Sequence, residues 1–360
     1  MSRINREQLI SELEMVKGGV SPREFVEQSS SFCFRDGMLM TFNDEVACKK
    51  ETCLKDITGA VQAASLTSIL SKLLDDELEV TENDRGELEF QGKRKRFAVT
   101  KDAEIFLPID RVEVPEKWKK LPPEFTEAVG LVKHCVSKDE NRFILTCIHL
   151  HPNYIEACDN LQLLRVAITT GLPAPVLVRG TSLEQLVHLA MDRVALTDSW
   201  IHFKNQQGLI YSCRRYMEEY PDLGPLLKVD GHKIVIPKGL AESTDRAAVF
   251  AADKEGDPLV KVSLRDGLIR IKGEGLTGWY KEVRKTTYKG PPLEFLISPD
   301  LLKHISEKYS DARISSDKLK VEGGSWEYAT VLGRPEKKKE AEEGEAEEKP
   351  AKKKKVASDE

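Results

Sequence analysis

An internal repeat constrains this chain more than any other feature of its sequence. One order of elements, a short helix followed by three short alternating strands, is expected three times. The helices are expected over 66–74, 183–190 and 301–305, where apolar residues recur three and four positions apart. The strands are expected at 77–80, 86–90 and 96–99, at 194–196, 200–203 and 209–212, and at 312–314, 318–321 and 326–329. Self-similarity of this kind indicates a repeated architecture.

A matching first half precedes each of these segments. It begins with an amphipathic helix, expected over 6–17, 124–136 and 238–251. A strand hairpin follows each helix, over 32–42 around Asp36-Gly37, over 143–166 around Asp159-Asn160, and over 260–271 around Asp266-Gly267. Asp-Gly between alternating apolar residues is typical of a tight hairpin turn. The predicted unit is therefore helix, strands, helix, strands.

Length and repeat together predict an α+β chain of three tandem domains and a tail. The domains are expected over 1–105, 122–223 and 224–334. Prolines and a change of composition indicate a linker over 106–121. Residues 335–360 are strongly charged and almost free of apolar residues, so they are expected to be a disordered, solvated tail. The run Lys352–Lys355 leaves open a nuclear import signal or a contact with nucleic acid.

Composition excludes several classes of protein. The chain has no run of eighteen apolar residues and no signal-peptide core, so neither a membrane span nor secretion is expected, and the predicted location is the cytoplasm. The seven cysteines form no Cys-x-x-Cys pair, which indicates reduced thiols rather than a metal site. His149 and His151 alternate along a probable strand and are interpreted as structural residues. A net charge of -5 does not exclude DNA, because it says nothing about how charge is distributed.

The repeat predicts how the units assemble. Each unit has one-sided helices and small antiparallel sheets, so the helices should share one side while the sheets pair with the next unit. Open edge strands at the two ends of the chain would be prone to aggregation. A head-to-tail contact that closes on itself removes those edges and gives a ring. The alternative is a string of three independent domains.

Three segments carry a resemblance to a known family. Leu161–Ile168, Tyr220–Leu223 and Arg246–Phe250, in that order, resemble the bacterial beta sliding clamp, and the similarity spans residues 4–332. The resemblance implies three clamp-type domains in each subunit of a homodimeric ring. It also implies a non-enzymatic protein without cofactor, which encircles duplex DNA and tethers a polymerase. The divergence from the family suggests a bacteriophage clamp or a distant bacterial one.

The resemblance also implies a pocket for short peptide motifs of the polymerase and clamp loader, between the second and third domains. The matching positions are Leu145, Thr170, Gly171, Leu172, Pro173, Pro221, Leu226, Val331 and Leu332. The family turn usually reads Thr-Asp-Gly-His-Arg-Leu, but here 169–173 reads Thr-Thr-Gly-Leu-Pro, without its histidine and arginine. The chain also continues past the pocket, where the family chain ends. Ordinary packing between domains remains the alternative reading of these residues.

The subunit interface implied by the resemblance joins a strand of the first domain to a helix end of the third. The matching residues are Phe97 and Val99 on one side and Val249 and Phe250 on the other. Phe97 follows the cationic run 93–96, which could pair with acidic residues across the seam. All four positions are also compatible with core packing.

A clamp must surround DNA without gripping it. Cations on the helix faces opposite the apolar stripes would neutralise phosphates without reading sequence. The lumen candidates are Lys17, Arg23, Lys72, Lys133, Arg193, Lys303 and Lys308. Glu12, Glu127, Glu184 and Glu307 lie on the same predicted helices, so a uniformly basic lumen is not expected. No aromatic platform for stacking unpaired bases is apparent, which favours duplex DNA.

Two other classes of function remain open. A DNA-processing enzyme is disfavoured because the sequence has no Gly-rich phosphate loop, no acidic cluster with metal spacing and no Ser-His-Asp pattern. A polymerase accessory factor with clamp-like domains that stays monomeric is the closer alternative. Its mass in solution and its behaviour on circular DNA would separate it from a ring.

Overall fold

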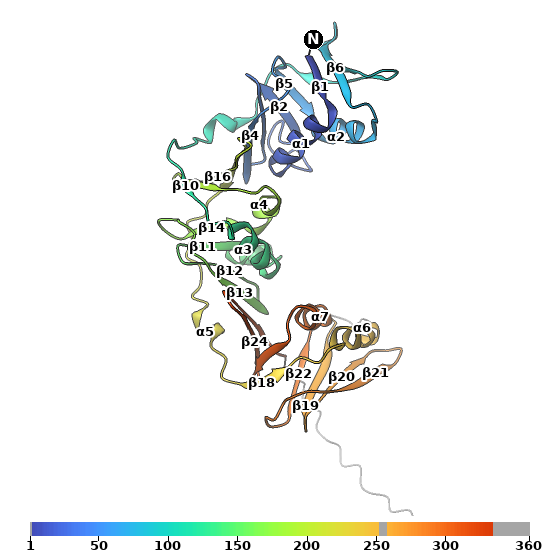
Figure 1. Cartoon of the computed structure of the whole chain (residues 1–360), viewed down its shortest axis with the longest axis vertical. Coiled ribbons are helices and arrows are strands. Elements are labelled where there is room, and N and C mark those ends of the chain that lie inside the picture. The colour runs from blue at the N-terminus through green and yellow to red at the C-terminus, as the bar shows by residue number, and fades with distance from the viewer. Residues whose placement is uncertain (1, 252–257, 334–360) are drawn as a thin grey trace, which may run out of the picture.

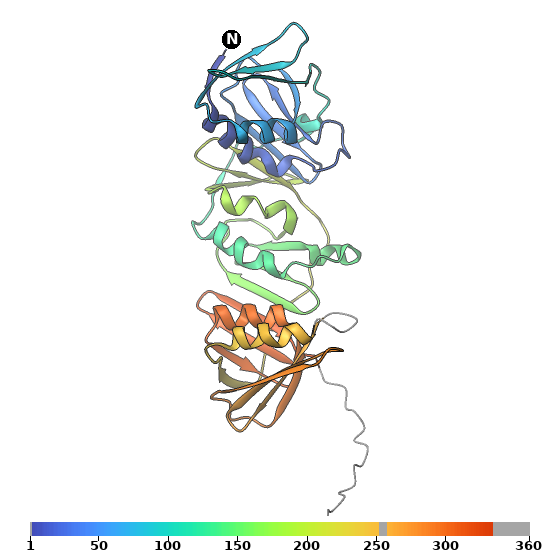
Figure 2. The same ribbon diagram turned by 90° about the vertical axis from the view of Figure 1, so that its right-hand side faces the viewer.

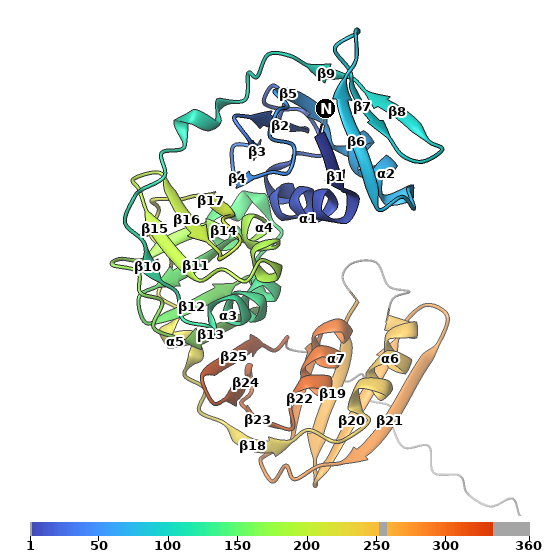
Figure 3. The same ribbon diagram turned by 45° about the horizontal axis from the view of Figure 1, so that its top comes forward.

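The computed structural model describes residues 2–251 and 258–333, so the predicted tail over 335–360 lies outside the described residues. The chain forms an open arc of three successive units (Figure 3). The helices of all three units lie on the same side of the molecule, which faces the viewer in Figure 2. In Figure 3 these helices line the inner side of the arc. This is the predicted packing, with helices sharing one side and sheets outside.

Within the described residues, the first unit contains two α-helices, the 3₁₀ turn η1 (Lys17–Gly19) and nine strands, followed by a short connecting segment. Its helices are α1 (Arg6–Val16) and α2 (Ala63–Lys72). The strands are β1 (Ser2–Asn5), β2 (Ser31–Arg35), β3 (Met38–Phe42), β4 (Val46–Glu51), β5 (Gly59–Gln62), β6 (Glu77–Glu82), β7 (Leu88–Gln91), β8 (Arg96–Val99) and β9 (Lys101–Asp102). The predicted linker is not featureless, because it holds the 3₁₀ turn η2 (Pro108–Arg111) and the strand β10 (Lys119–Lys120).

The second unit repeats this order with shorter helices. Its helical elements are α3 (Phe125–Val132), η3 (Lys133–Cys135), η4 (Glu140–Thr146), α4 (Gly180–Leu183) and η5 (Leu186–His188). The strands are β11 (Cys147–His151), β12 (Tyr154–Cys158), β13 (Gln162–Ala167), β14 (Val176–Arg179), β15 (Arg193–Leu196), β16 (Trp200–Lys204) and β17 (Ile210–Arg214). The helix expected over 183–190 is therefore broken into a helical turn and a 3₁₀ turn.

The third unit is entered through α5 (Gly224–Leu227). Its long helices are α6 (Leu240–Ala251) and α7 (Pro299–Lys308). The strands are β18 (His232–Val235), β19 (Val260–Arg265), β20 (Leu268–Glu274), β21 (Trp279–Lys285), β22 (Leu293–Ile297), β23 (Asp311–Ile314), β24 (Lys318–Gly323) and β25 (Trp326–Val331). The described chain therefore carries the predicted repeat three times, as an α+β fold of antiparallel sheets and few helices.

Local sequence explains where these elements begin and turn. Asn5 caps α1, because its side-chain oxygen accepts a hydrogen bond from the Gln8 amide at 3.0 Å. Asp36 and Gly37 have φ values of 53° and 71°, as a type I′ turn between β2 and β3 requires. Asp266 and Gly267 form the corresponding turn between β19 and β20, with φ values of 55° and 70°.

The second unit departs from the predicted hairpin over 143–166. Its turn between the first two strands is formed by Pro152 and Asn153, and residues 143–146 belong to η4. Asp159 instead organises the next turn, where its carboxylate accepts hydrogen bonds from the amides of Leu161 and Gln162 at 2.6 and 2.8 Å. Asp159 and Asn160 therefore lie in a turn, as predicted, but this turn joins β12 to β13 and not the first two strands of the unit.

Continuous sheets join the three units. A nine-stranded sheet crosses the first boundary where β4 pairs with β17, and an eight-stranded sheet crosses the second where β13 pairs with β25. Four-stranded sheets lie at the two ends, in the orders β1-β6-β7-β8 and β21-β20-β19-β22. Because backbone hydrogen bonds join neighbouring units at both boundaries, the three units are not independent domains. These hydrogen bonds hold the curvature of the arc.

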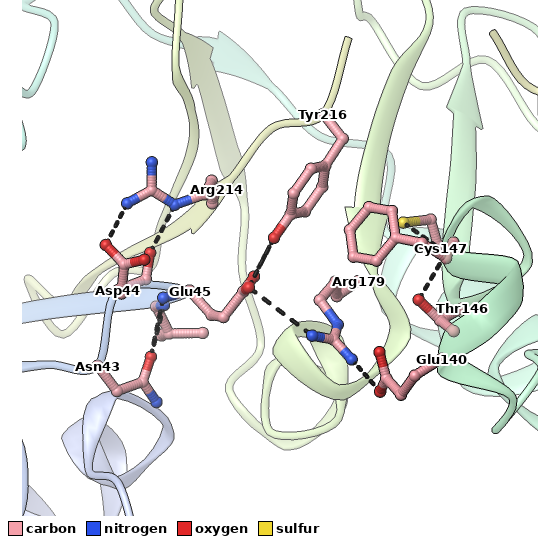
Figure 4. Close-up of polar contacts among 11 residues, drawn as sticks. Asn43, Asp44, Glu45, Glu140, Thr146, Cys147, Arg179, Arg214 and Tyr216 are labelled. Carbon is pink, nitrogen blue, oxygen red and sulfur yellow. Dashed lines mark hydrogen bonds and ion pairs between the residues drawn. The ribbon is translucent and has the colours of Figure 1, made fainter. Parts of the chain in front are cut away.

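Polar side chains lock the first boundary as well (Figure 4). The Tyr216 hydroxyl donates to the Glu45 carboxylate, with both oxygens 2.6 Å away. Desolvation by burial raises the pKa of Tyr216, and this hydrogen bond raises it further. Arg179 reaches Glu45 at 3.8 Å and also pairs with Glu140. Arg214 pairs with Asp44 beside them. The network links the turn before β4 to the second unit.

Candidate functional site

The inner side of the arc carries most of the predicted DNA-contacting cations. Lys17, Lys72, Lys133, Lys303 and Lys308 lie within or at the ends of the helices that line it, and Arg23 lies on the loop after α1. Their side chains are exposed or half-buried. The face is nevertheless mixed in charge, because Lys17 pairs with Glu14 at 3.2 Å and Lys303 with Asp245 at 3.0 Å.

Arg193 does not share this face. It is the first residue of the strand β15, and the next residue, Val194, is buried in the core. Because side chains alternate along a strand, Arg193 points to the side away from the helices. The prediction placed Arg193 on a helix face, whereas the structure places it on a strand.

Two histidines that the sequence analysis missed lie beside the predicted cations. The rings of His134, in η3, and His304, in α7, are 6.1 Å apart at the boundary between the second and third units. Burial lowers the pKa of both, and the charge of Lys308 lowers both further. No repeat or motif marks this pair, since the two residues are far apart in sequence.

The outer side of the second boundary holds a small apolar pocket. Leu226 of α5 and Val331 of β25, both predicted pocket residues, line it together with Leu161, Leu163 and Ala329. Leu161, Leu226 and Val331 are 53%, 44% and 41% exposed. Beneath them, Leu163 and Ala329 pack against Leu223 and Leu227, and Leu145 packs on the same cluster. Apolar side chains therefore remain uncovered at this junction.

The other predicted pocket residues lie outside this lining. Leu172 is 5% exposed and packs in the main core, and Leu332 is buried there too. Thr170 is buried, with its hydroxyl donating to the His151 carbonyl at 2.9 Å, whereas Pro173 and Pro221 are exposed. Gly171 has a φ of 76°, which the turn after β13 needs. Only Leu145, Leu226 and Val331 therefore meet at one place.

The first boundary has a corresponding groove that the chain fills itself. It lies over the cross-strand pair of Ala47 and Ser212, as the pocket lies over Leu163 and Ala329. Leu107, Ile109 and Val112 of the connecting segment pack into the cluster there. The second boundary receives only Leu223 and Leu227 from its connecting segment. More apolar side chains of the connecting segment therefore cover the first boundary than the second.

Two of the edge strands lie at the two ends of the arc, β8 in the first unit and β21 in the third (Figure 3). Each has internal counterparts. We count the cross-strand pairs from the pair that closes each hairpin turn, which are 92 with 95, 205 with 209 and 323 with 326. Phe97 of β8 is then in the third pair, as are Tyr211 of β17 and Tyr328 of β25. Tyr280 of β21 likewise corresponds to Cys48 of β4 and Leu164 of β13. At the two internal boundaries these positions pair directly, Tyr211 with Cys48 and Tyr328 with Leu164.

Within the part of the chain that the structure describes, no three His, Cys, Asp or Glu side chains are grouped to hold a metal ion. His149 instead contacts Glu156 at 2.8 Å, and Glu156 also pairs with Arg165 at 2.7 Å. No helix of residues 2–251 and 258–333 has the length and apolar character needed to cross a membrane.

A repeated α+β arc with inner helices and sheets shared across its boundaries is also the fold of solved DNA polymerase III beta subunits. Solved structures are similar over nearly all of the chain. The DNA polymerase III beta chain of Streptococcus pneumoniae has a TM-score of 0.78 and 17% identity, and the match covers 92% of this chain and 99% of that one. The beta subunit of Thermotoga maritima has a TM-score of 0.79 and 16% identity, over 93% and 99%.

The particular fold is that of the bacterial beta sliding clamp, as the sequence resemblance predicted. A sliding clamp from Bartonella birtlesii, solved bound to griselimycin, has a TM-score of 0.79 and 18% identity, over 93% of this chain and 99% of that one. The beta sliding clamp of Rickettsia bellii is 25% identical over 233 residues. That match covers 60% of this chain and spans only 61% of the relative's length. No protein-family profile matches the chain.

Proposed function

We propose that this chain is a DNA sliding clamp, a non-enzymatic protein of which two copies close into a ring around duplex DNA. The observation that carries the proposal is the repeated boundary. At both internal boundaries the third strand after the second helix of one unit, β17 or β25, pairs with the third strand after the first helix of the unit before it, β4 or β13. The edge strands β8 and β21 have the same places in their units, so they would form a third boundary of this kind. A second copy supplies the missing half at each end, which closes the assembly.

The internal boundaries also give the register of the proposed seam. Phe97 would face Tyr280 of the second copy, because their counterparts pair at both internal boundaries. Tyr211 and Tyr328 are 0% and 2% exposed, whereas Phe97 is only partly buried, stacked on Phe90 at 4.8 Å. A partner strand would complete its burial.

The same register supports the predicted interface residues. Val99 would lie opposite Gly278 of the second copy. The ring of Phe250 lies 3.2 Å from the position that a Cβ on Gly278 would occupy, so Val99 and Phe250 would meet there. Val249, the residue before Phe250 in α6, is 66% exposed. Apolar groups at the seam would therefore gain burial on closure.

The inner helices support loose contact with duplex DNA. Exposed lysines near acidic partners can neutralise phosphates without holding one register, which permits sliding. The uncovered pocket at Leu161, Leu226 and Val331 supports a polymerase or clamp-loader peptide as its occupant, because apolar anchors of an extended peptide fit such a cleft. Such a clamp works where DNA is copied, in the cytoplasm of a bacterial cell.

Two measurements test the proposal. Light scattering should give twice the chain mass of 40.5 kDa. Protein loaded on nicked circular DNA should co-elute with it through high salt and be lost after a single linearising cut. A monomer that binds circular and linear DNA equally would instead establish the accessory-factor alternative, and turnover of a DNA substrate would establish an enzyme.

A further inference from the structure

The outer face of the last sheet is uncovered and strongly basic. Helices α6 and α7 pack on the opposite face of β19, β20 and β21 (Figure 1), where Val262, Ile269 and Ile271 are buried beneath them. Because side chains alternate along strands, the residues between these core positions point outward. They include Lys261, Arg270, Lys272 and Lys281.

Three of these lysines form a ladder across the sheet. Lys261 is directly opposite Lys272, and Lys272 is directly opposite Lys281. Neighbouring strands lie about 4.8 Å apart, so the ladder sets like charges side by side, which destabilises a sheet. Lys261 pairs with Glu294 and Lys272 with Glu274, each at 2.8 Å. Lys281 and Arg270 make no ion pair within the described residues.

The sheet is also hollowed on this face. A concavity of about 470 Å³ is lined by Lys261, Arg265, Arg270, Lys272 and Lys281, and by only two acidic residues, Asp266 and Glu294. Trp279 lies two residues before Lys281, and therefore on the same face, with 64% of its surface exposed. Cations spaced along a shallow trough, with an exposed aromatic ring elsewhere on the same face, are suited to a flexible polyanion.

The basic face is not a property of the repeat. The residues that correspond to Lys261, Lys272 and Lys281 are Cys33, Met40 and Lys49 in the first unit. In the second unit they are His149, Glu156 and Arg165. Among the described residues, only the third unit therefore sets lysines directly opposite one another at these positions, although opposed like charges destabilise a sheet.

We propose that this face binds single-stranded nucleic acid through its phosphates, on the outside of the arc and apart from any DNA within it. An acidic peptide fits less well, because the trough has no deep apolar subsite to anchor one. The inference goes beyond the clamp function. It requires neither a closed ring nor the pocket at the second boundary.

The test uses the full chain and fluorescein-labelled linear (dT)20, from which a ring would slide off. Fluorescence anisotropy is measured over a series of salt concentrations for Lys261→Gln/Arg270→Gln/Lys272→Gln, none of which lies on the edge strand β21. The matched control is Lys117→Gln/Lys119→Gln/Lys120→Gln, three exposed lysines of the connecting segment. Loss of three phosphate contacts should lower the salt slope by about 2 and the affinity at least tenfold. The control should change neither.

Each other outcome overturns the proposal. Equal affinity and slope in the ladder and control variants would show that (dT)20 binds elsewhere. Displacement of (dT)20 by polyglutamate at matched charge would show an acidic-polypeptide site, and equally tight, ladder-dependent binding of a linear 20-bp duplex would exclude single-strand preference. Retention on nicked circular DNA reports the clamp function separately, and the ladder variant should preserve it.

Discussion

A proline at position 98 should separate the folding of the chain from its assembly. In the hairpin of β7 and β8, the Gly92 amide bonds the Lys95 carbonyl at 2.8 Å. Because hydrogen-bonded pairs alternate in an antiparallel ladder, the next bonded pairs are 90 with 97 and 88 with 99. The backbone groups of Ala98 therefore point to the free edge. Ala98→Pro removes an N–H that only a second copy would use.

The magnitude follows from the internal boundaries. The counterparts of Ala98 are Ser212 and Ala329. The Arg214 amide donates to the Glu45 carbonyl at 2.9 Å, and the Val331 amide donates to the Leu161 carbonyl at 2.8 Å. Because hydrogen-bonded pairs alternate, Ser212 and Ala329, two residues earlier, also belong to hydrogen-bonded pairs across these boundaries. Losing one such bond costs about 1 kcal/mol, and the unpaired carbonyl opposite adds about 1–3 kcal/mol. A ring has two seams, so the substitution should cost roughly 4–8 kcal/mol of dimerisation free energy, which corresponds to about 10³- to 10⁶-fold weaker dimerisation.

Sedimentation equilibrium over a concentration series measures this change. Ala98→Pro should give a monomer whose urea midpoint is close to that of the parent chain, since proline is tolerated on an edge strand. Ala98→Val is the matched control, because it keeps the N–H and suits a strand, and it should remain dimeric. An unchanged dissociation constant for the proline variant, or a monomeric valine variant, would refute the seam.

Four further predictions follow from the described contacts. Leu226→Asp with Val331→Asp should weaken binding of a polymerase-derived peptide at least tenfold by calorimetry without altering the dimer, and the exposed-site control Leu74→Asp should have no effect. Leu172→Asp should instead destabilise the second unit, because Leu172 is buried, and a normal melting temperature would contradict its placement. Burial lowers the pKa of His202 from 6.5 to about 4, so the stability gained by keeping it neutral is complete above pH 6.5 and is lost as the pH falls toward 4. Urea titrations should show roughly 3 kcal/mol of loss that His202→Gln removes. Lys72→Glu with Lys308→Glu should shorten the lifetime of the protein on nicked circular DNA, and an unchanged lifetime would remove these lysines from the inner contact surface.

The sequence predicted the repeat and the location of most elements because the signals are local. Apolar spacing marks α1, α6 and α7, and Asp-Gly marks two of the three leading hairpins. In the second unit the predicted elements were wrong in two places. Its second helix is broken at Glu184–Gln185, and its first hairpin turns at Pro152-Asn153, where no Asp-Gly occurs.

The candidate sites were less predictable because they depend on contacts between distant segments. Leu226 and Val331 meet only when β25 pairs with β13, and no local pattern distinguishes them from Leu172, which the same fold buries. Arg193 was misplaced because strand alternation, not helix periodicity, sets its direction. The basic ladder emerged only from the cross-strand register of β19, β20 and β21.

A covalent lock on the proposed seam tests most directly whether duplex DNA passes through a closed ring of two chains. Cysteines are placed at Ala98 and Trp279, which should face each other across each seam, in a background where the partly exposed Cys53 is serine. The variant is loaded on nicked circular DNA, joined with a short bismaleimide and denatured in detergent. If the ring surrounds the duplex, the denatured and cross-linked protein will stay on the circle until the DNA is cut. Protein that cross-links at both seams but leaves the intact circle in detergent would contradict the ring.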